Sequence, residues 1–316
     1  MQAQSAQEQT AQAPSAQAQS ARGKIGIVGL GIMGGAMARN LLDAGWRVIG
    51  YDIDPARCTE LAASGVAIAA DVVALAREAP VLLLSLPSPA AALATAEAIA
   101  ASGAERRVVI EASTLTLKDK LAIEAVLRVA GHVALDCPIS GTGAQARTRD
   151  LVIYASGDAQ SIEALRPLFS GFSRAVHDVG AYGNGSRMKF VANLLVAIHN
   201  VASAEAMVLG VKAGLDARQV VDLVSAGAGT SRVFELRAPM MAARTYQPAS
   251  MRMEIWQKDM AIIGQFATEL GCPTPLLSAT LPIYAAAMAQ GHAADDTAAV
   301  CAVLEVMAGM AGAGTG

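Results

Sequence analysis

The sequence is poor in cysteine, aromatic residues and charge. Its 316 residues include four cysteines, while aromatic residues make up 4% and charged residues 16% of the chain. The cysteines are scattered and form no Cys-x-x-Cys motif, which favours free thiols in a reducing compartment, so we expect a cytoplasmic protein. The four histidines show no metal-ligating spacing either, and we therefore expect no metal site.

The chain also lacks a basic cluster and an uninterrupted apolar run of membrane-spanning length. A net charge of −3 gives no electrostatic footprint for nucleic acid or anionic lipid. Among the long uncharged windows, residues 79–96 contain Pro87 and Pro89, and residues 190–204 are too short to span a bilayer. We therefore expect neither a nucleic-acid nor a membrane partner, and a small molecule is the expected ligand.

The first 22 residues differ in composition from the rest. Residues 1–22 form a Gln/Ala/Ser tract with too few bulky apolar side chains to bury a core, which predicts a disordered polar tail. The remaining chain is long enough for two domains.

A strand-like run followed by a glycine motif opens the folded part. Residues 24–28 lead directly into Gly29-Leu30-Gly31-Ile32-Met33-Gly34, after which the pattern becomes helical. In such a motif the first glycine makes a tight turn, the second lets the backbone approach a pyrophosphate, and the third lets helix and strand pack closely. The pyrophosphate rests on the helix N-terminus, so the predicted cofactor site comprises Gly29, Gly31, Ile32, Met33 and Gly34.

A second strand-like run, residues 46–52, ends in an acidic residue. Asp52 follows Gly29 by 23 residues, where a carboxylate hydrogen-bonds the adenosine ribose of a dinucleotide. The same carboxylate repels a 2′-phosphate, so we expect NAD to be preferred, with NADP not excluded. A glycine-rich turn followed by an unrelated acid is the alternative, but the ordered set of elements favours the cofactor site.

Alternation of strand and helix patterns continues to residue 179. Further strands are predicted at 81–86, 108–111, 132–136, 151–155 and 175–179, which together indicate a Rossmann-type doubly wound α/β sheet. Residues that directly follow parallel strands face the ligand crevice. Leu86, Pro87 and Thr114 are therefore candidates for the cofactor wall, although such a residue taken alone is more often a plain loop residue.

Small residues crowd the segment that follows Asp136. Ser140, Gly141 and Thr142 offer several backbone N–H groups to a single anion. A substrate carboxylate is the candidate ligand, and a plain surface turn is the alternative.

The motif Gly183-Asn184-Gly185 opens the longest apolar helical pattern. Lys189 and Asn193 lie four residues apart and therefore on one face of this helix. No other charged residue occurs in residues 190–204, so partial desolvation of Lys189 would favour a neutral amine able to accept a proton. The alternative is an ordinary solvated lysine at a helix start.

Only helical patterns follow. Helices are predicted at 186–213, 217–225, 231–241, 252–270, 275–290 and 295–311. We therefore predict a dinucleotide-binding domain over residues 23–183. An all-helical domain for substrate binding and oligomerisation is predicted over residues 184–316, linked to the first by one long helix.

With these segments, the sequence resembles the β-hydroxyacid dehydrogenase family over roughly residues 24–304. That family includes 3-hydroxyisobutyrate dehydrogenases and 2-hydroxy-3-oxopropionate (tartronate semialdehyde) reductases. Four motifs carry the resemblance, and they are the glycine fingerprint, Asp136-Cys137-Pro138-Ile139-Ser140-Gly141, Gly183-Asn184-Gly185 with Lys189 and Asn193, and Trp256-Gln257-Lys258-Asp259.

The resemblance implies both an activity and a set of residue roles. It implies NAD(P)-dependent hydride transfer that interconverts a small β-hydroxy acid and its semialdehyde or keto form, with Lys189 as general acid/base. Asn193 would help to hold the substrate, whose carboxylate would bind Ser140, Gly141 and Thr142. Lys258 would approach the cofactor, and Asp259 would orient it. It further implies a 6-phosphogluconate dehydrogenase-like C-terminal domain and a homodimer or homotetramer assembled through the helical domains.

Alternative functions on the same scaffold are reduction of an imine or another semialdehyde, and a catalytically silent NAD-binding sensor. Departures from the family pattern leave the substrate open among 3-hydroxyisobutyrate, glycerate or tartronate semialdehyde, and threonate-like acids. Thr142 replaces the usual second glycine, Leu194 replaces a second asparagine, and Arg149 or Asp150 stands where a glycine is expected. Further candidates for the pocket lining are Phe234, Arg232 and Trp256.

Overall fold

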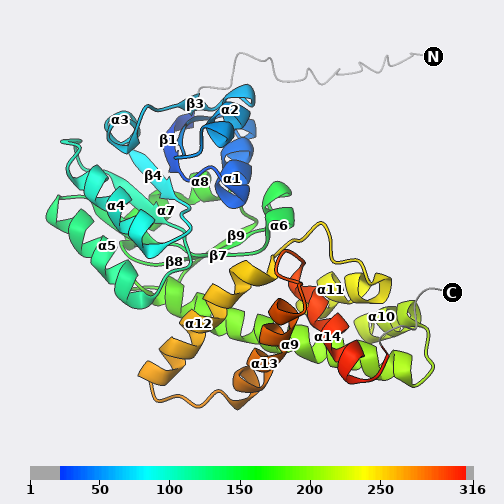
Figure 1. Ribbon diagram of the computed structural model, residues 1–316. Coiled ribbons are helices and arrows are strands. Elements are labelled where there is room, and N and C mark those ends of the chain that lie inside the picture. The colour runs from blue at the N-terminus through cyan, green and yellow to red at the C-terminus, as the bar shows by residue number, and fades with distance from the viewer. Residues whose placement is uncertain (1–21, 311–316) are drawn as a thin grey trace, which may run out of the picture.

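A computed structural model of the chain describes residues 22–310 and consists of an α/β half followed by a helical half (Figure 1). The tail predicted over residues 1–22 lies outside the described residues, except for Arg22, which already belongs to the first strand. The predicted fold class, a Rossmann-type sheet followed by helices, is confirmed.

The α/β half is built on a six-stranded parallel sheet with the order β3-β2-β1-β4-β5-β6. Its strands are β1 (Arg22–Val28), β2 (Trp46–Tyr51), β3 (Ala67–Ile68), β4 (Val81–Leu84), β5 (Val108–Glu111) and β6 (Val133–Asp136). The strand order changes direction between β1 and β4, and ligands of such sheets bind outside the carboxyl ends of the strands at this point. The glycine motif lies there.

Both faces of this sheet are covered, which explains the continuous apolar runs of its strands. Ile27 and Leu83 pack on the side of α1 (Ile32–Asp43) and α2 (Pro55–Ala63). The neighbouring residues Leu82 and Leu84 point the other way, because successive side chains of a strand alternate between faces. That face is covered by α3 (Val72–Glu78), α4 (Pro89–Ala100) and α5 (Leu117–Val129).

Two predicted strands do not join this sheet. The strands predicted at 151–155 and 175–179 are β8 (Val152–Ala155) and β9 (Ala175–Asp178), and they form a second sheet with β7 (Ile139–Ser140). Their assignment to the doubly wound sheet was wrong, because the short β7 runs antiparallel to β8 and turns the chain away from β6. The isolated bridge between Asp136 and Ser156 connects the two sheets. Short helices accompany them, namely α6 (Gly143–Arg147), α7 (Ala159–Ala164) and α8 (Arg166–Phe169).

The helical half has its own hydrophobic core. Its elements are α9 (Asn184–Lys212), α10 (Ala217–Ser225), α11 (Arg232–Ala243), α12 (Met253–Glu269), α13 (Pro275–Ala289), the 3-10 helix η1 (Thr297–Ala299) and α14 (Val300–Met307). Helix α9 contacts the second sheet at its start and the other helices along its length (Figure 1).

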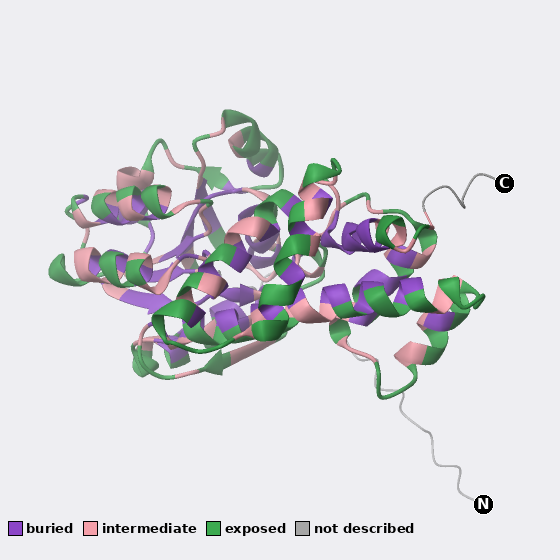
Figure 2. Cartoon of the chain, turned by 60° about the horizontal axis from the view of Figure 1, so that its bottom comes forward, coloured by how far each residue is buried: buried purple, intermediate pink, exposed green. Residues whose placement is uncertain are grey.

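Helix α9 is the one described helix that is long and apolar enough to cross a bilayer, judged by length and composition alone. This was not predicted from the sequence, because the uncharged window of residues 190–204 is shorter than a bilayer span. In the structure, 44% of its most apolar 18-residue window is buried. Figure 2 shows buried residues concentrated on the strands and on the inner sides of the helices. The central packing helix of a globular domain has the same properties.

Candidate active site

The glycine motif lies where β1, α1 and the end of β4 approach one another closely. Gly29 has φ +91°, and a Cβ on it would lie 2.2 Å from the carbonyl oxygen of Ser85. A Cβ on Gly34 would lie 1.8 Å from the carbonyl oxygen of Gly29. Both positions therefore require glycine, the first also for its left-handed backbone.

The N-terminus of α1 is open to an anion. Its N-cap residue is Gly31, no side chain caps the helix, and no acidic residue occurs in its first turn. Backbone N–H groups of a first helical turn have no partner within the helix, and they bind phosphate favourably. The N–H groups of Ile32, Met33 and Gly34 are therefore available to a pyrophosphate, and their contact with one stays a prediction.

Asp52 holds the glycine loop against the end of β2. One carboxylate oxygen, Oδ2, accepts a hydrogen bond from Leu30 N at 2.7 Å, and Oδ1 accepts one from Asp54 N at 2.9 Å. Arg57 Nη1 lies 3.5 Å from Asp52 Oδ2 and next to Gly31. This arginine was missed, because it belongs to the following helix and nothing in its spacing marks it. The predicted contact of Asp52 with ribose stays a prediction.

The cofactor-wall candidates lie on two neighbouring loops. Leu86 and Pro87 follow β4, and Thr114 follows β5. Leu86 N donates to Ser113 Oγ at 2.9 Å, which joins the two loops. Lys258 Nζ donates to the carbonyl oxygen of Thr114 at 2.8 Å. The structure thus brings Lys258 of the helical half to the wall predicted for the cofactor.

Lys189 and Asn193 lie near Lys258 and Asp259 of α12. Asn193 Nδ2 donates to Asp259 Oδ2 at 3.1 Å, and Lys258 Nζ lies 3.6 Å from Asp259 Oδ1. Lys189 is 7% exposed, which excludes the alternative of a solvated lysine. Two lysines, an amide and a carboxylate therefore gather where α9 and α12 meet the α/β half.

The ionisation of this cluster is perturbed. Burial lowers the pKa of Lys189, Lys258 lowers it further, and the carboxylate of Asp259 opposes both. Burial raises the pKa of Asp259, against the effects of Lys258 and Lys189. A lysine whose pKa is lowered loses its proton more readily, which is the property a general base requires.

The predicted carboxylate loop lies at the start of α6. Ser140 ends β7, Gly141 has φ +142°, and Thr142 is the N-cap residue of α6. The N–H of Thr142 donates to Gln145 Oε1 at 3.0 Å and is therefore not free for a ligand, contrary to expectation. A Cβ on the following Gly143 would lie 2.5 Å from Ile32 Cγ2, so this loop touches the cofactor loop.

Other residues singled out in the sequence lie elsewhere. Arg149 is exposed, and its Nη2 lies 3.7 Å from Asp43 Oδ2 on α1. Its φ of +60° is the left-handed conformation that glycine adopts readily, which accounts for the glycine expected there. Arg232 is also exposed and pairs with Glu235 at 3.0 Å. Three residues pack in or against the core of the helical half, namely Leu194, Phe234 and Trp256.

Comparisons with known proteins agree with this architecture. Residues 24–180 match the family model described as the NAD-binding domain of 6-phosphogluconate dehydrogenase. Residues 183–304 match the model described as NAD-binding of NADP-dependent 3-hydroxyisobutyrate dehydrogenase.

Individual relatives cover nearly the whole chain. The L-threonate dehydrogenase of Haemophilus influenzae is 31% identical over 87% of this chain and 92% of its own length. The NAD-dependent L-serine dehydrogenase of Pseudomonas aeruginosa is 30% identical over 86% of this chain and 95% of its own. A structure of Mycobacterium tuberculosis 3-hydroxyisobutyrate dehydrogenase with L-serine superposes with a TM-score of 0.81 at 28% identity, covering 89% of this chain and 98% of that one. The chain therefore belongs to the β-hydroxyacid dehydrogenase family and is an NAD(P)-dependent 3-hydroxyacid dehydrogenase.

Proposed function

We propose that the chain oxidises the β-hydroxyl group of a small carboxylic acid, or catalyses the reverse reduction, with Lys189 as the general acid/base. The observation that carries the proposal is the burial of Lys189 beside Asn193, Asp259 and Lys258, within reach of the predicted cofactor wall. A nicotinamide held against the predicted cofactor wall would supply the hydride acceptor in the oxidation direction. The neutral amine of Lys189 takes the hydroxyl proton, and its ammonium returns that proton in the reduction direction.

Asn193 and Asp259 would orient the reacting groups. Asn193 donates its amide N–H to Asp259, which leaves its amide oxygen available to a substrate hydroxyl. Lys258, tied to the Thr114 carbonyl, would keep α12 against the cofactor wall and hold Asp259 in place. Asn193, Lys258 and Asp259 would therefore fix the geometry in which Lys189 exchanges its proton.

The predicted carboxylate loop and the names of the relatives support a proposed substrate class. Threonate, serine and 3-hydroxyisobutyrate, the compounds named for the relatives, each carry a carboxylate and a hydroxyl on the β-carbon. We propose that the carboxylate of such an acid binds the loop of Ser140, Gly141 and Thr142, through groups other than the occupied Thr142 N–H.

We propose NAD as the preferred cofactor. The negative charge of Asp52, at the end of β2, disfavours a 2′-phosphate and suits the free ribose hydroxyls of NAD. Asp54 adds a second carboxylate nearby, and Arg57 lies between the two. The net charge around the predicted ribose site is therefore negative.

One experiment tests the proposed activity. A panel of β-hydroxy acids, including L-threonate, L-serine and 3-hydroxyisobutyrate, is incubated with NAD or NADP while NAD(P)H absorbance is followed. We expect turnover with at least one of these acids and a higher kcat/KM with NAD. Cofactor binding without turnover across the panel would instead indicate an NAD-binding sensor.

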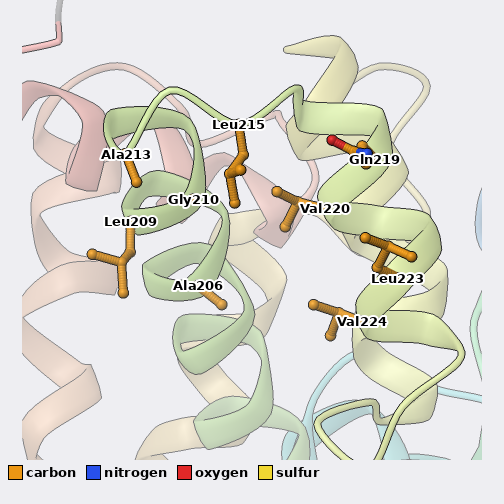
Figure 3. Close-up of a pocket in the computed structure, with 9 residues that line it drawn as sticks. All are labelled: Ala206, Leu209, Gly210, Ala213, Leu215, Gln219, Val220, Leu223 and Val224. Carbon is orange, nitrogen blue, oxygen red and sulfur yellow. The ribbon is translucent and has the colours of Figure 1, made fainter.

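We further propose that two or four copies associate through the helical half. An apolar groove of about 490 Å³ lies between the end of α9 and α10. Figure 3 shows the side chains that line it. Leu209, Leu215 and Leu223 are 73%, 54% and 67% exposed there, and leucines gathered in one groove in this way suit contact with a second copy. Light scattering is expected to give the mass of a dimer or tetramer, and a monomer at micromolar concentration contradicts the proposal.

A further inference from the structure

Three charged side chains are completely buried beneath the candidate active site. Glu111 ends β5, Lys120 lies in α5, Asp136 ends β6, and all three are 0% exposed. Lys120 Nζ pairs with the Glu111 carboxylate, lies 3.0 Å from Asp136 Oδ1 and donates to the carbonyl oxygen of Glu111 at 3.2 Å. We call Glu111, Lys120 and Asp136 the buried triad.

Stability alone gives little reason for such a triad. Each buried ion costs several kcal/mol of hydration, and well-packed neutral replacements of buried ion pairs are often neutral or stabilising. Burial by itself would lower the pKa of Lys120, but Asp136 and Glu111 outweigh it and the pKa is raised. Lys120 therefore stays charged, with two carboxylates bound to it.

One end of the triad reaches the loops predicted to form the cofactor wall. Glu111 Oε1 accepts a hydrogen bond from Ser113 N at 3.0 Å. Ser113 Oγ in turn accepts one from Leu86 N at 2.9 Å, and Thr114 is the next residue of the chain. The carboxylate of Glu111 thus fixes both loops, those after β4 and β5.

The other end of the triad holds the start of the helix that carries Lys189. Asp136 Oδ2 accepts from Ser186 N at 2.7 Å, and Asp136 Oδ1 accepts from Ser186 Oγ at 2.9 Å. Ser186 lies one turn before Lys189. The contact is close, since a Cβ on Gly185 would lie 2.6 Å from the carbonyl oxygen of Asp136.

We infer that the buried triad is a positioning device that fixes α9, and with it Lys189, relative to the cofactor wall. The inference rests on the proposed role of Lys189. A displacement of about 1 Å between reacting groups can cost roughly 100-fold in rate, so a rigid connection of this kind affects turnover directly. The triad acts through geometry, because burial, Asp259 and Lys258 are the influences that set the pKa of Lys189.

Two variants test the inference. In Asp136→Asn, one carboxylate oxygen becomes an amide nitrogen, so the side chain cannot accept from both Ser186 N, which uses Oδ2, and Lys120 Nζ, which uses Oδ1. The neutral triple variant Glu111→Gln/Lys120→Met/Asp136→Asn leaves no unpaired buried charge and guards against a failure of the single variant to fold. For both we measure kcat, KM, NADH affinity by fluorescence, the melting temperature and the pH profile.

For the folded variants we expect kcat to fall about 10- to 100-fold. NADH affinity should change by less than about threefold, equivalent to well under 1.4 kcal/mol. The inflection of kcat with pH should not move. The triple variant should regain thermal stability relative to Asp136→Asn without regaining kcat.

A matched control is Asp296→Asn. Asp296 is also 0% exposed, accepts backbone hydrogen bonds and lies 3.4 Å from a buried arginine, Arg237, but in the core of the helical half. It should lose stability and keep the kcat of its folded fraction. Wild-type kcat in the folded triple variant overturns the inference, as does an equal loss of kcat in Asp296→Asn. Failure of the proposed function is separate, since it would show as retained turnover in Lys189→Met.

Discussion

Gly34→Ala tests whether the close approach of α1 to the glycine loop is needed for cofactor binding. The new Cβ would lie 1.8 Å from the carbonyl oxygen of Gly29, whereas real Cβ contacts essentially never fall under 3.0 Å. Helix and loop must therefore separate by about 1 Å, and overpacking of this kind costs about 1–3 kcal/mol. If that displacement weakens the pyrophosphate contacts by a similar amount, NADH affinity falls about 10- to 100-fold, since 1.4 kcal/mol is tenfold.

The assay is fluorescence titration with NADH, combined with urea unfolding. Gly264→Ala is the matched control, because Gly264 also lies within a helix, α12, and its added Cβ meets nothing within 4 Å. That control should gain about 0.5–1 kcal/mol of stability from helix propensity and keep its NADH affinity. Wild-type NADH affinity in Gly34→Ala would refute the role assigned to this contact.

Three further predictions concern ionisation, cofactor choice and backbone strain. Asp259→Asn removes the charge that raises the pKa of Lys189, so the rise of kcat with pH in the oxidation direction should move to lower pH, while Lys258→Met should move it to higher pH. Unmoved profiles contradict this. Asp52→Asn should reduce the preference for NAD over NADP in kcat/KM by about tenfold, the equivalent of 1.4 kcal/mol. If the wild-type protein itself prefers NADP, the assignment of Asp52 is wrong. Arg149→Gly should raise the unfolding free energy by up to about 1 kcal/mol in urea, because its left-handed backbone suits glycine, and a clear loss would contradict this.

Local patterns accounted for much of the fold. Neighbouring residues suffice to predict the glycine motif, the buried parallel strands and the helices after Gly183. Strand burial and helix periodicity both appear as patterns of apolar residues within a short window. The spacing of Lys189 and Asn193 predicted that these two share a helix face, whereas the roles of Lys258 and Asp259 came from the family resemblance. The structure places the four residues together. The tertiary contact of Lys258 with Thr114 had no local signal.

The features that escaped prediction depend on contacts between distant segments. The second sheet depends on β7, which has only two residues and therefore shows no periodicity in the sequence. Lys120 is separated from its partner Asp136 by a helix and a turn, so nothing in its own segment marks it as buried. Likewise, Gln145 occupies the N–H of Thr142 through a turn of α6 that the small residues of the loop did not indicate.

Turnover of Lys189→Met tests the central claim most directly. Methionine keeps an apolar side chain of similar length and removes the amine, so NADH binding should stay close to wild type. With the best acid of the panel and saturating NAD, kcat should fall by about 10²- to 10⁴-fold, the usual contribution of a positioned general acid/base. Near-wild-type turnover in this variant would contradict the assignment of proton transfer to Lys189.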